Sequence, residues 1–275
     1  MQISTELAER AEAEAMFALV SGASAEAADR LGMAAARIGG GIATSVHADE
    51  TRFWSKVLGL GLDQPVTAAV LDEAVSFSIA QGSPSTTFQT APALLPPDWA
   101  ALCETYGITA GSSWVKLVRP AAGFEPARTA LRVEQVTDAQ AERAAGVLAA
   151  GFGMSADVVR SLYVPALRRG DFQAFAAWHD DVMVAAAGVR IDGSTASMYG
   201  AATLPEFRGR GAQSALLAAR AQLADHHGCQ WLIAETGLPD EPGGNPSLNN
   251  MTRAGFEVLY ERRNYLWRAP TGKVK

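Results

Sequence analysis

The order of strand and helix patterns in residues 131–268 is the feature that most limits the folds open to this chain. A strand pattern at Leu131–Val136 precedes two helical patterns, "DAQAERAAGVLAAGFG" and "SADVVRSLYVPALRRG". Three segments with strand character follow, "DFQAFAAWH", "DVMVAAAGVRI" and "STASMYGAAT", and the turns "DD" and "DG" between them indicate a meander. A helix, the strand "CQWLIAET", a short helix in "NPSLNNMTRAG" and final strands in "FEVLYERRNYLWR" complete the order βααβββαβαββ. This order predicts an α/β (α+β) fold with a mixed, mostly antiparallel sheet flanked by helices.

The sequence pattern of the first 120 residues resembles that of the second half. Two segments, "TELAERAEAEAMFALVSG" and "SAEAADRLGMAAARIGG", end at glycine, and we predict a helix over each. The segments 103–120 and 251–270 both run from a helix end through glycine to strands, and Thr67–Gly82 matches the helix that starts near Gly211. Residues 119–130, "RPAAGFEPARTA", have the proline, glycine and alanine content of a linker. We therefore predict a degenerate tandem repeat with domains at 1–120 and 130–275.

Composition excludes several functional classes. A net charge of −6 and a pI near 5.3 argue against a general nucleic-acid binder, because affinity for a phosphate backbone needs a basic surface. The longest apolar run, Val182–Val189, is too short to cross a bilayer, and the N-terminus does not resemble a secretory signal. Cys103 and Cys229 lack metal-binding spacing, so we expect no metal and no structural disulfide. We expect a cytoplasmic protein, a monomer or homodimer, without membrane or nucleic-acid partners.

One loop has the charge of an anion site. The sequence "RGRGAQ" precedes a helix whose start has no acidic residue, although a helix N-terminus favours a nearby anion. Gly209 and Gly211 permit a backbone that turns its N–H groups inward, and Arg208 and Arg210 add positive charge. An ordinary tight turn with solvated arginines is an equally good interpretation. Neither a P-loop nor a dinucleotide fingerprint fits, because the chain has no GxxxxGK and position 214 is serine.

The loop resembles the Arg/Gln-x-x-Gly-x-Gly/Ala motif of the GNAT superfamily of acyl-CoA-dependent N-acyltransferases. "TLPEFRGRGAQSALL", "NPSLNNMTRAGFEV" and the element order extend the resemblance from Leu131 to about Arg268. It implies that an acyl-CoA binds with its pyrophosphate on the loop and its pantetheine arm along the end of the preceding strand. The cofactor-binding residues carried over in this way are Ala201, Ala202, Thr203, Arg208, Gly209, Arg210, Gly211, Ala212 and Gln213. Gln213 departs from the family pattern, which has glycine or alanine there.

The catalytic residues match the family less well. Family members attack the thioester directly, with an Asp or Glu that removes a proton and often a Tyr that protonates the thiolate. Here Met251 occupies the usual position of that tyrosine, and the strand "STASMYGAAT" has no carboxylate. Glu235 and Tyr199 are the remaining catalytic candidates, although a solvated glutamate and a packed tyrosine are open alternatives. Asn245 and Ser247 are candidates to contact the pantetheine, and Asn245 before Pro246 also fits a helix N-cap.

The sequence therefore predicts an N-acyltransferase. We expect it to transfer acetyl from acetyl-CoA, or another acyl group from its acyl-CoA, to an amine of a small molecule by direct attack. The alternative is a non-catalytic acyl-CoA-binding or sensing module, and a nicotinamide-dependent enzyme is a weaker third. The counterpart loop of the first half, "GLDQPVTAA", has Asp63, a self-capping Thr67 and no Arg-Gly pair. We expect this half to have lost cofactor binding and to wall the acceptor cleft.

Overall fold

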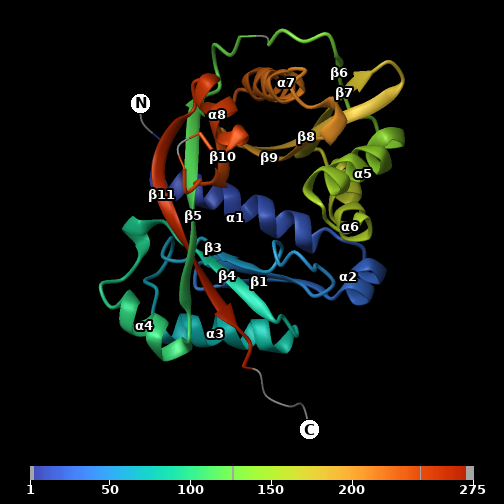
Figure 1. The fold of residues 1–275 in the computed structure, drawn as a ribbon. Helices are drawn as coiled ribbons and strands as arrows, with labels where there is room; N and C mark the ends of the chain where they lie inside the picture. The colour runs from blue at the N-terminus through green and yellow to red at the C-terminus, as the bar shows by residue number, and fades with distance from the viewer. Residues whose placement is uncertain (1–2, 126, 242, 271–275) are drawn as a thin grey trace.

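The computed structural model describes residues 3–125, 127–241 and 243–270 (Figure 1). The first half contains, in order, α1 (Thr5–Ser21), α2 (Ala25–Leu31), β1 (Met33–Ile38), β2 (Gly41–Val46), β3 (Lys56–Leu58), α3 (Ala68–Ala80), β4 (Ser85–Gln89), the 3-10 turn η1 (Pro92–Leu94), α4 (Trp99–Tyr106) and β5 (Thr109–Pro120). The second half contains β6 (Arg132–Gln135), η2 (Asp138–Gln140), α5 (Ala141–Phe152), α6 (Ala156–Leu167), β7 (Phe172–His179), β8 (Val182–Asp192), β9 (Thr195–Thr203), η3 (Pro205–Phe207), α7 (Ala212–His226), β10 (Trp231–Gly237), α8 (Pro246–Arg253) and β11 (Glu257–Arg268).

The predicted fold class is confirmed, with two local differences. The helix expected over residues 24–40 is wrong beyond Leu31, because Gly32 takes a left-handed conformation (φ +59°) that ends α2. Met33–Ile38 then pairs antiparallel with β2 as strand β1. The final strands predicted in the second half are one strand, β11, with two register shifts. Pro126 of the predicted linker lies outside the described residues.

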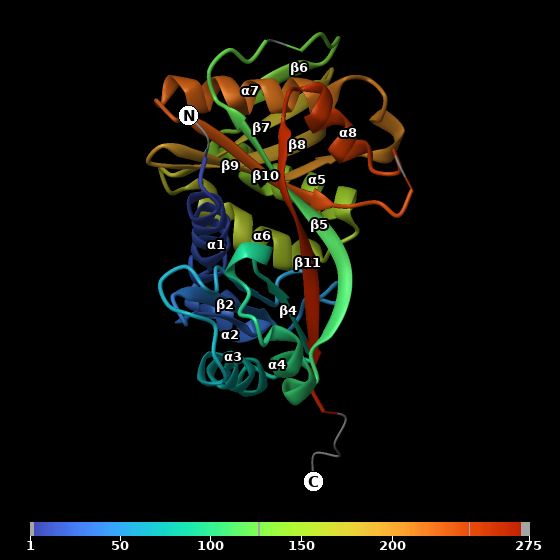
Figure 2. The same cartoon turned by 90° about the vertical axis from the view of Figure 1, so that its left-hand side faces the viewer.

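The two halves form one eleven-stranded sheet in the order β1-β2-β3-β4-β11-β5-β10-β9-β8-β7-β6. β5 comes from the first half but lies between β10 and β11, and β11 comes from the second half but lies between β4 and β5. Both strands run the height of the molecule side by side (Figures 1 and 2). The halves therefore exchange equivalent strands, and these strands belong to the two similar segments 103–120 and 251–270.

The tandem repeat is visible in the order of elements around the sheet. Each half has one parallel strand pair, β3–β4 in the first and β9–β10 in the second, and a helix connects each pair. These helices are α3 and α7, the two predicted counterparts, and Thr67 caps α3 through its own hydroxyl as expected. The predicted repeat is thus present in the topology.

Helix α1 packs between the other elements of the first half and those of the second half (Figure 1). Its apolar side chains Met16 and Leu19 belong to one buried cluster with Leu58 of β3, Leu162 of α6 and Phe172 of β7. A core shared in this way buries apolar surface of both halves together. Among the described residues, no helix is long and apolar enough to span a membrane.

Candidate active site

A cavity of about 420 Å³ lies where the halves meet, a size that suits a small organic ligand. The first half contributes side chains from α1, β3, β5 and the residues before β3, and the second contributes side chains from α5, α6, β9, α7, β10 and α8. The wall is mostly apolar; examples are Met16, Leu19, Trp54, Trp114, Val159, Met198 and Met251.

Strands β9 and β10 separate at the edge of this cavity. Their parallel pairing ends at Met198 and Ala234, although β9 continues to Thr203 and β10 to Gly237. Gly200 is left over in the pairing with β8 as a bulge, with φ +55°. The end of β10 pairs with β5, while Ala201–Thr203 pair with β8 on their other edge. The backbone edge of Ala201–Thr203 that faces β10 consequently has no partner strand among the described residues. Within this stretch, the Thr203 carbonyl accepts a hydrogen bond from Arg208 Nε at 3.3 Å.

The glycine loop has the backbone that the sequence predicts. Gly209 and Gly211 have φ values of +77° and +81°. Gly211 is the N-cap of α7, no side chain caps this helix, and its first turn has no acidic residue. A Cβ at position 211 would lie 3.1 Å from the carbonyl oxygen of Arg128, so the space at this turn suits glycine. The N-terminal N–H groups of α7 are thus available to an anion.

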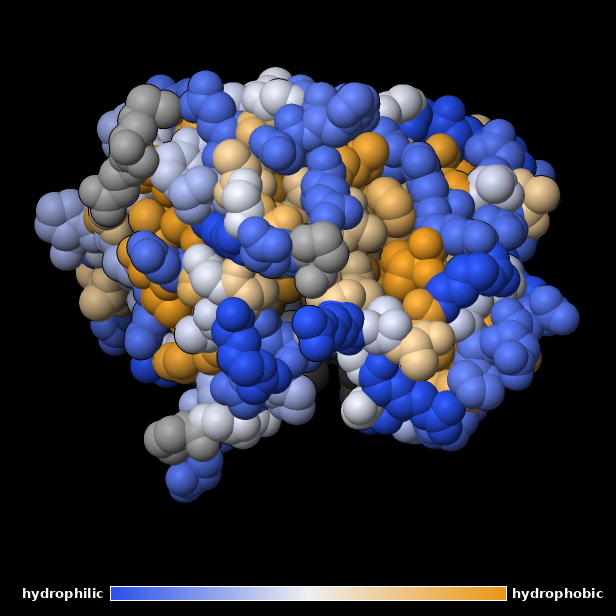
Figure 3. Space-filling model, turned by 90° about the horizontal axis from the view of Figure 1, so that it is seen from above, coloured by the Kyte–Doolittle hydropathy of each residue, from blue (hydrophilic) through white to orange (hydrophobic). Residues whose placement is uncertain are grey.

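Side chains around the loop fix its position. The Thr129 hydroxyl donates to the carbonyl of Arg210 (2.9 Å), and the guanidinium of Arg210 lies over the Phe207 ring. Gln213, the residue that departs from the family pattern, donates to the Thr203 hydroxyl at 2.9 Å and lines the cavity. Hydrophilic side chains cover much of the α7 end of the molecule, with hydrophobic patches between them (Figure 3).

Three residues singled out from the sequence, Asn245, Ser247 and Met251, lie in the segment after β10. The Asn245 side-chain oxygen accepts from the backbone N–H groups of Ser247 and Leu248, and its nitrogen donates to Thr236 Oγ1 (2.9 Å) and the Gly237 carbonyl (2.7 Å). Asn245 therefore caps α8 and fastens it to the end of β10. Ser247 is exposed and lines the cavity, as does the buried Met251.

Both catalytic candidates line the cavity. Glu235 lies on β10 where that strand leaves β9, and its carboxylate accepts from Lys116 Nζ at 2.8 Å. Burial, together with the nearby Glu12, raises the pKa of Glu235, and Lys116 opposes this shift. Tyr199 packs between Tyr163 and Phe172, and burial raises its pKa well above the ordinary value. Tyr199 therefore stays protonated at neutral pH.

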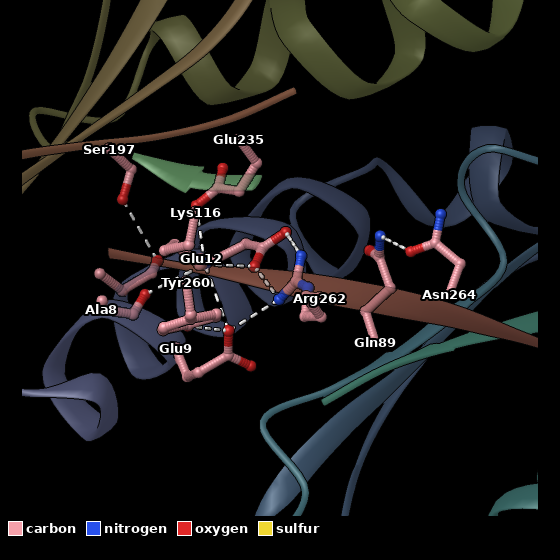
Figure 4. A network of polar contacts seen from close by, with 11 residues as sticks. Ala8, Glu9, Glu12, Gln89, Lys116, Ser197, Glu235, Tyr260, Arg262 and Asn264 are labelled. Carbon is pink, nitrogen blue, oxygen red and sulfur yellow. Dashed lines mark hydrogen bonds and ion pairs between the residues drawn. The ribbon is translucent and has the colours of Figure 1, made fainter. Parts of the chain in front are cut away.

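Behind Glu235 lies a buried ionic network that joins α1 to the exchanged strands (Figure 4). Lys116 of β5 contacts Glu12 (2.5 Å) and Glu235, and Arg262 of β11 contacts Glu12 (2.7 and 2.9 Å) and Glu9 (2.8 Å). Sequence reasoning missed this network. Its signals were a lysine inside the apolar strand "WVKLV" and two glutamates three residues apart on a predicted helix.

Comparison with known families identifies a stretch within this half of the chain. Residues 150–243 match the Acetyltransferase (GNAT) family. These residues form a GNAT domain. The match spans the strand meander, the glycine loop, α7 and β10, which are the elements around the open strand edge. No curated protein matches the chain.

Solved structures show that the GNAT domain is part of a tandem GNAT fold. The chain is similar to a GCN5-related N-acetyltransferase from Kribbella flavida, with 18% identity and a TM-score of 0.65 over 98% of both chains. It is also similar to a tandem GNAT protein from the clavulanic acid biosynthesis pathway, with 16% identity and a TM-score of 0.58 over 99% of this chain and 98% of that one. A GCN5-related N-acetyltransferase from Sphaerobacter thermophilus has 13% identity and a TM-score of 0.57 over 97% and 94%.

Proposed function

We propose that this protein transfers an acetyl group from acetyl-CoA, or another acyl group from its acyl-CoA, to an amine of a small molecule. The observation that carries the proposal is the open edge of β9 beside an uncapped helix N-terminus with a glycine loop. An acyl-CoA presents a diphosphate and an amide-containing arm, which need anion-binding N–H groups and an open strand edge, respectively. The described residues offer both features side by side.

Each predicted binding residue has a role in this proposal. The backbone N–H groups of Gly209–Gln213 bind the diphosphate, and Arg208 and Arg210 add charge at the loop. The edge of Ala201–Thr203 pairs with the pantetheine amides, and Ser247 also lines the cavity. Asn245 is occupied by its bonds to α8 and β10, so we assign it a positioning role instead of a pantetheine contact.

Chemistry takes place in the cavity. Acetyl-CoA supplies a thioester whose C–S bond breaks as the acceptor nitrogen forms its C–N bond. Glu235 takes the proton that the amine loses, a role that suits a carboxylate whose pKa burial has raised. Tyr199 is the hydroxyl that returns a proton to the departing thiolate, since Met251 cannot donate one. Lys116 holds the Glu235 carboxylate in place.

The first half walls the acceptor cleft in this proposal. Trp54 and Trp114 of that half line the cavity beside Tyr199 and Glu235. We keep the domain limits of 1–120 and 130–275 as a proposal, with acyl-CoA binding assigned to the second domain only. We further propose a cytoplasmic location and a monomeric or dimeric state, without nucleic-acid or metal partners.

A non-catalytic acyl-CoA sensor is the second candidate. Two observations favour it: Met251 lies at the cavity where the family usually has a proton-donating tyrosine, and Glu235 already forms an ion pair with Lys116. A thiol-release assay with acetyl-CoA and a panel of small amines separates the candidates. Thiol release above the hydrolysis background supports the enzyme, whereas acetyl-CoA binding without release from any amine supports the sensor.

Calorimetric titration with acetyl-CoA tests the binding site itself. Arg210→Glu combined with Gly211→Val places a like charge at the diphosphate and a β-branched side chain at φ +81°, so affinity should fall about a hundredfold or more. Arg168→Glu is the matched control, because Arg168 is exposed and lines neither the cavity nor the loop. Unchanged affinity in the double variant contradicts the assignment.

A further inference from the structure

Lys56 is a buried cation on the wall of the cavity that the proposed mechanism does not use. It begins strand β3 in the first half and is 4% exposed. Its ammonium lies 3.8 Å from the centre of the Phe53 ring and 5.0 Å from the centre of the Trp114 ring. These ring faces attract the positive charge and fix its position, but they are poor partners for its N–H donors.

The carboxylates near Lys56 are already engaged. Glu12 and Glu235 influence it electrostatically, yet Glu12 forms ion pairs with Lys116 and Arg262, and Glu235 with Lys116. Among the described residues, no hydrogen bond or ion pair to the Lys56 ammonium is found. The three donors of this ammonium therefore have no protein acceptor in this part of the chain, and the nitrogen, which borders the cavity, is left to water or to a ligand that enters there.

The electrostatic surroundings of Lys56 also favour an anionic ligand. Burial, helped by Arg262 and Lys116, lowers the pKa of Lys56 from 10.5 to about 8 against the opposing effect of Glu12 and Glu235. Most Lys56 side chains are thus still protonated at neutral pH. An anion placed against the ammonium would satisfy its donors and favour its charged form.

We propose that Lys56 binds a carboxylate of the acceptor, which makes the acceptor a small molecule with an amine, a carboxylate and an apolar body. The amine part rests on the proposed acyltransferase function, because it places the amine at Glu235. The apolar part follows from Met16, Leu19 and Trp54, which line the same cavity. The first half then selects the acceptor through Lys56 in addition to enclosing it.

Pairs of small probes test the carboxylate contact on the full-length protein. Calorimetry with coenzyme A present, which carries no acyl group to transfer, compares hydrocinnamate with hydrocinnamamide, and L-phenylalanine with phenethylamine. Each pair keeps the phenyl body and removes the carboxylate. We expect the carboxylate of each pair to bind about tenfold more tightly or better, the size of a charge-assisted hydrogen bond. Equal binding within the pairs, or no detectable binding of either carboxylate, overturns the proposal.

Variants locate the preference at Lys56. Lys56→Met should remove the carboxylate preference and Lys56→Arg should keep most of it. Arg168→Met, which removes an exposed cation outside the cavity, should leave it unchanged. A preference that survives Lys56→Met overturns the proposal, and Lys56→Gln, which also removes the charge, makes the same comparison if the Met variant does not fold. Failure of the proposed function can be told apart from failure of the carboxylate contact. The first appears as absent acetyl-CoA binding or absent thiol release, and the second appears in the probe comparison.

Discussion

At the scale of single residues, Gly200 permits the separation of β9 from β10. It has φ +55°, and a Cβ at this position would lie 2.3 Å from the Tyr163 hydroxyl oxygen. Both its backbone conformation and its surroundings therefore favour glycine. Because Ala201–Thr203 begin directly after it, the bulge at Gly200 positions the strand edge proposed for pantetheine.

Substitution of Gly200 tests this role. We expect Gly200→Ala to lower the free energy of unfolding by about 2–4 kcal/mol, from the positive φ and from the clash with Tyr163. Gly193→Ala is a matched control, because Gly193 has φ +54° but nothing within 4 Å of an added Cβ, so it should cost only about 1 kcal/mol. Urea unfolding measures both, and equal costs would show that Tyr163 does not constrain position 200.

Lys56 links stability to function. Its pKa is lowered from 10.5 to about 8, so between these values the unfolded chain binds more protons than the folded chain. Stability should therefore rise as pH increases through this range. We expect Lys56→Met to be more stable than the wild type near neutral pH by about 1–3 kcal/mol and to show a smaller rise. Urea unfolding at neutral pH and near pH 10 checks this; a less stable variant at neutral pH contradicts it.

At the scale of elements, helix α1 is held to the sheet by ions as well as by apolar packing. Glu12 of α1 contacts both Lys116 of β5 and Arg262 of β11, so one side chain ties the helix to both exchanged strands. Burial alone would raise the pKa of Glu12, but Arg262 and Lys116 hold it below the ordinary value. The stability that Glu12 contributes is therefore present at neutral pH and lost as pH falls below 4.5.

Removal of this carboxylate should be costly. Glu12→Ala leaves two buried cations without their shared partner, and we expect a loss of about 3–5 kcal/mol in the free energy of unfolding. Glu14→Ala is the control on the same helix, since its partner Arg37 is 58% exposed and such pairs contribute about 0–1 kcal/mol. Thermal or urea unfolding compares them, and a similar loss in both variants would argue against a specific role for the network.

The sequence predicts the elements better than the contacts between them. The meander, the glycine loop and α7 follow from local patterns, such as alternation, turn residues and glycines with positive φ, and these predictions are confirmed. The boundary between α2 and β1 was misjudged because Ala34–Ala36 fit a helix as readily as a strand. The pair of Lys116 with Glu12 joins residues 104 positions apart, and no local pattern specifies such a contact.

At the scale of the whole molecule, the exchange of β5 and β11 makes each half incomplete. The second half has β10 and β11, but the strand between them comes from the first half. The echo of segments 103–120 and 251–270 revealed a repeat, yet two equivalent strands can exchange places without any change in sequence pattern. The sequence therefore predicts the repeat and leaves the exchange undetermined.

This exchange predicts how the protein responds to division. Without β5, residues 126–275 expose the edge of β10 and lose Lys116 as the partner of Glu235, so we expect no cooperative unfolding transition and no acetyl-CoA binding. Co-expression of residues 1–125 as a separate chain should restore both properties, because the missing strand is supplied again. Circular dichroism during thermal unfolding and calorimetry with acetyl-CoA measure the two outcomes. If residues 126–275 alone unfold cooperatively and bind acetyl-CoA as tightly as the intact chain, the exchanged strand is dispensable and the second half is an autonomous GNAT domain.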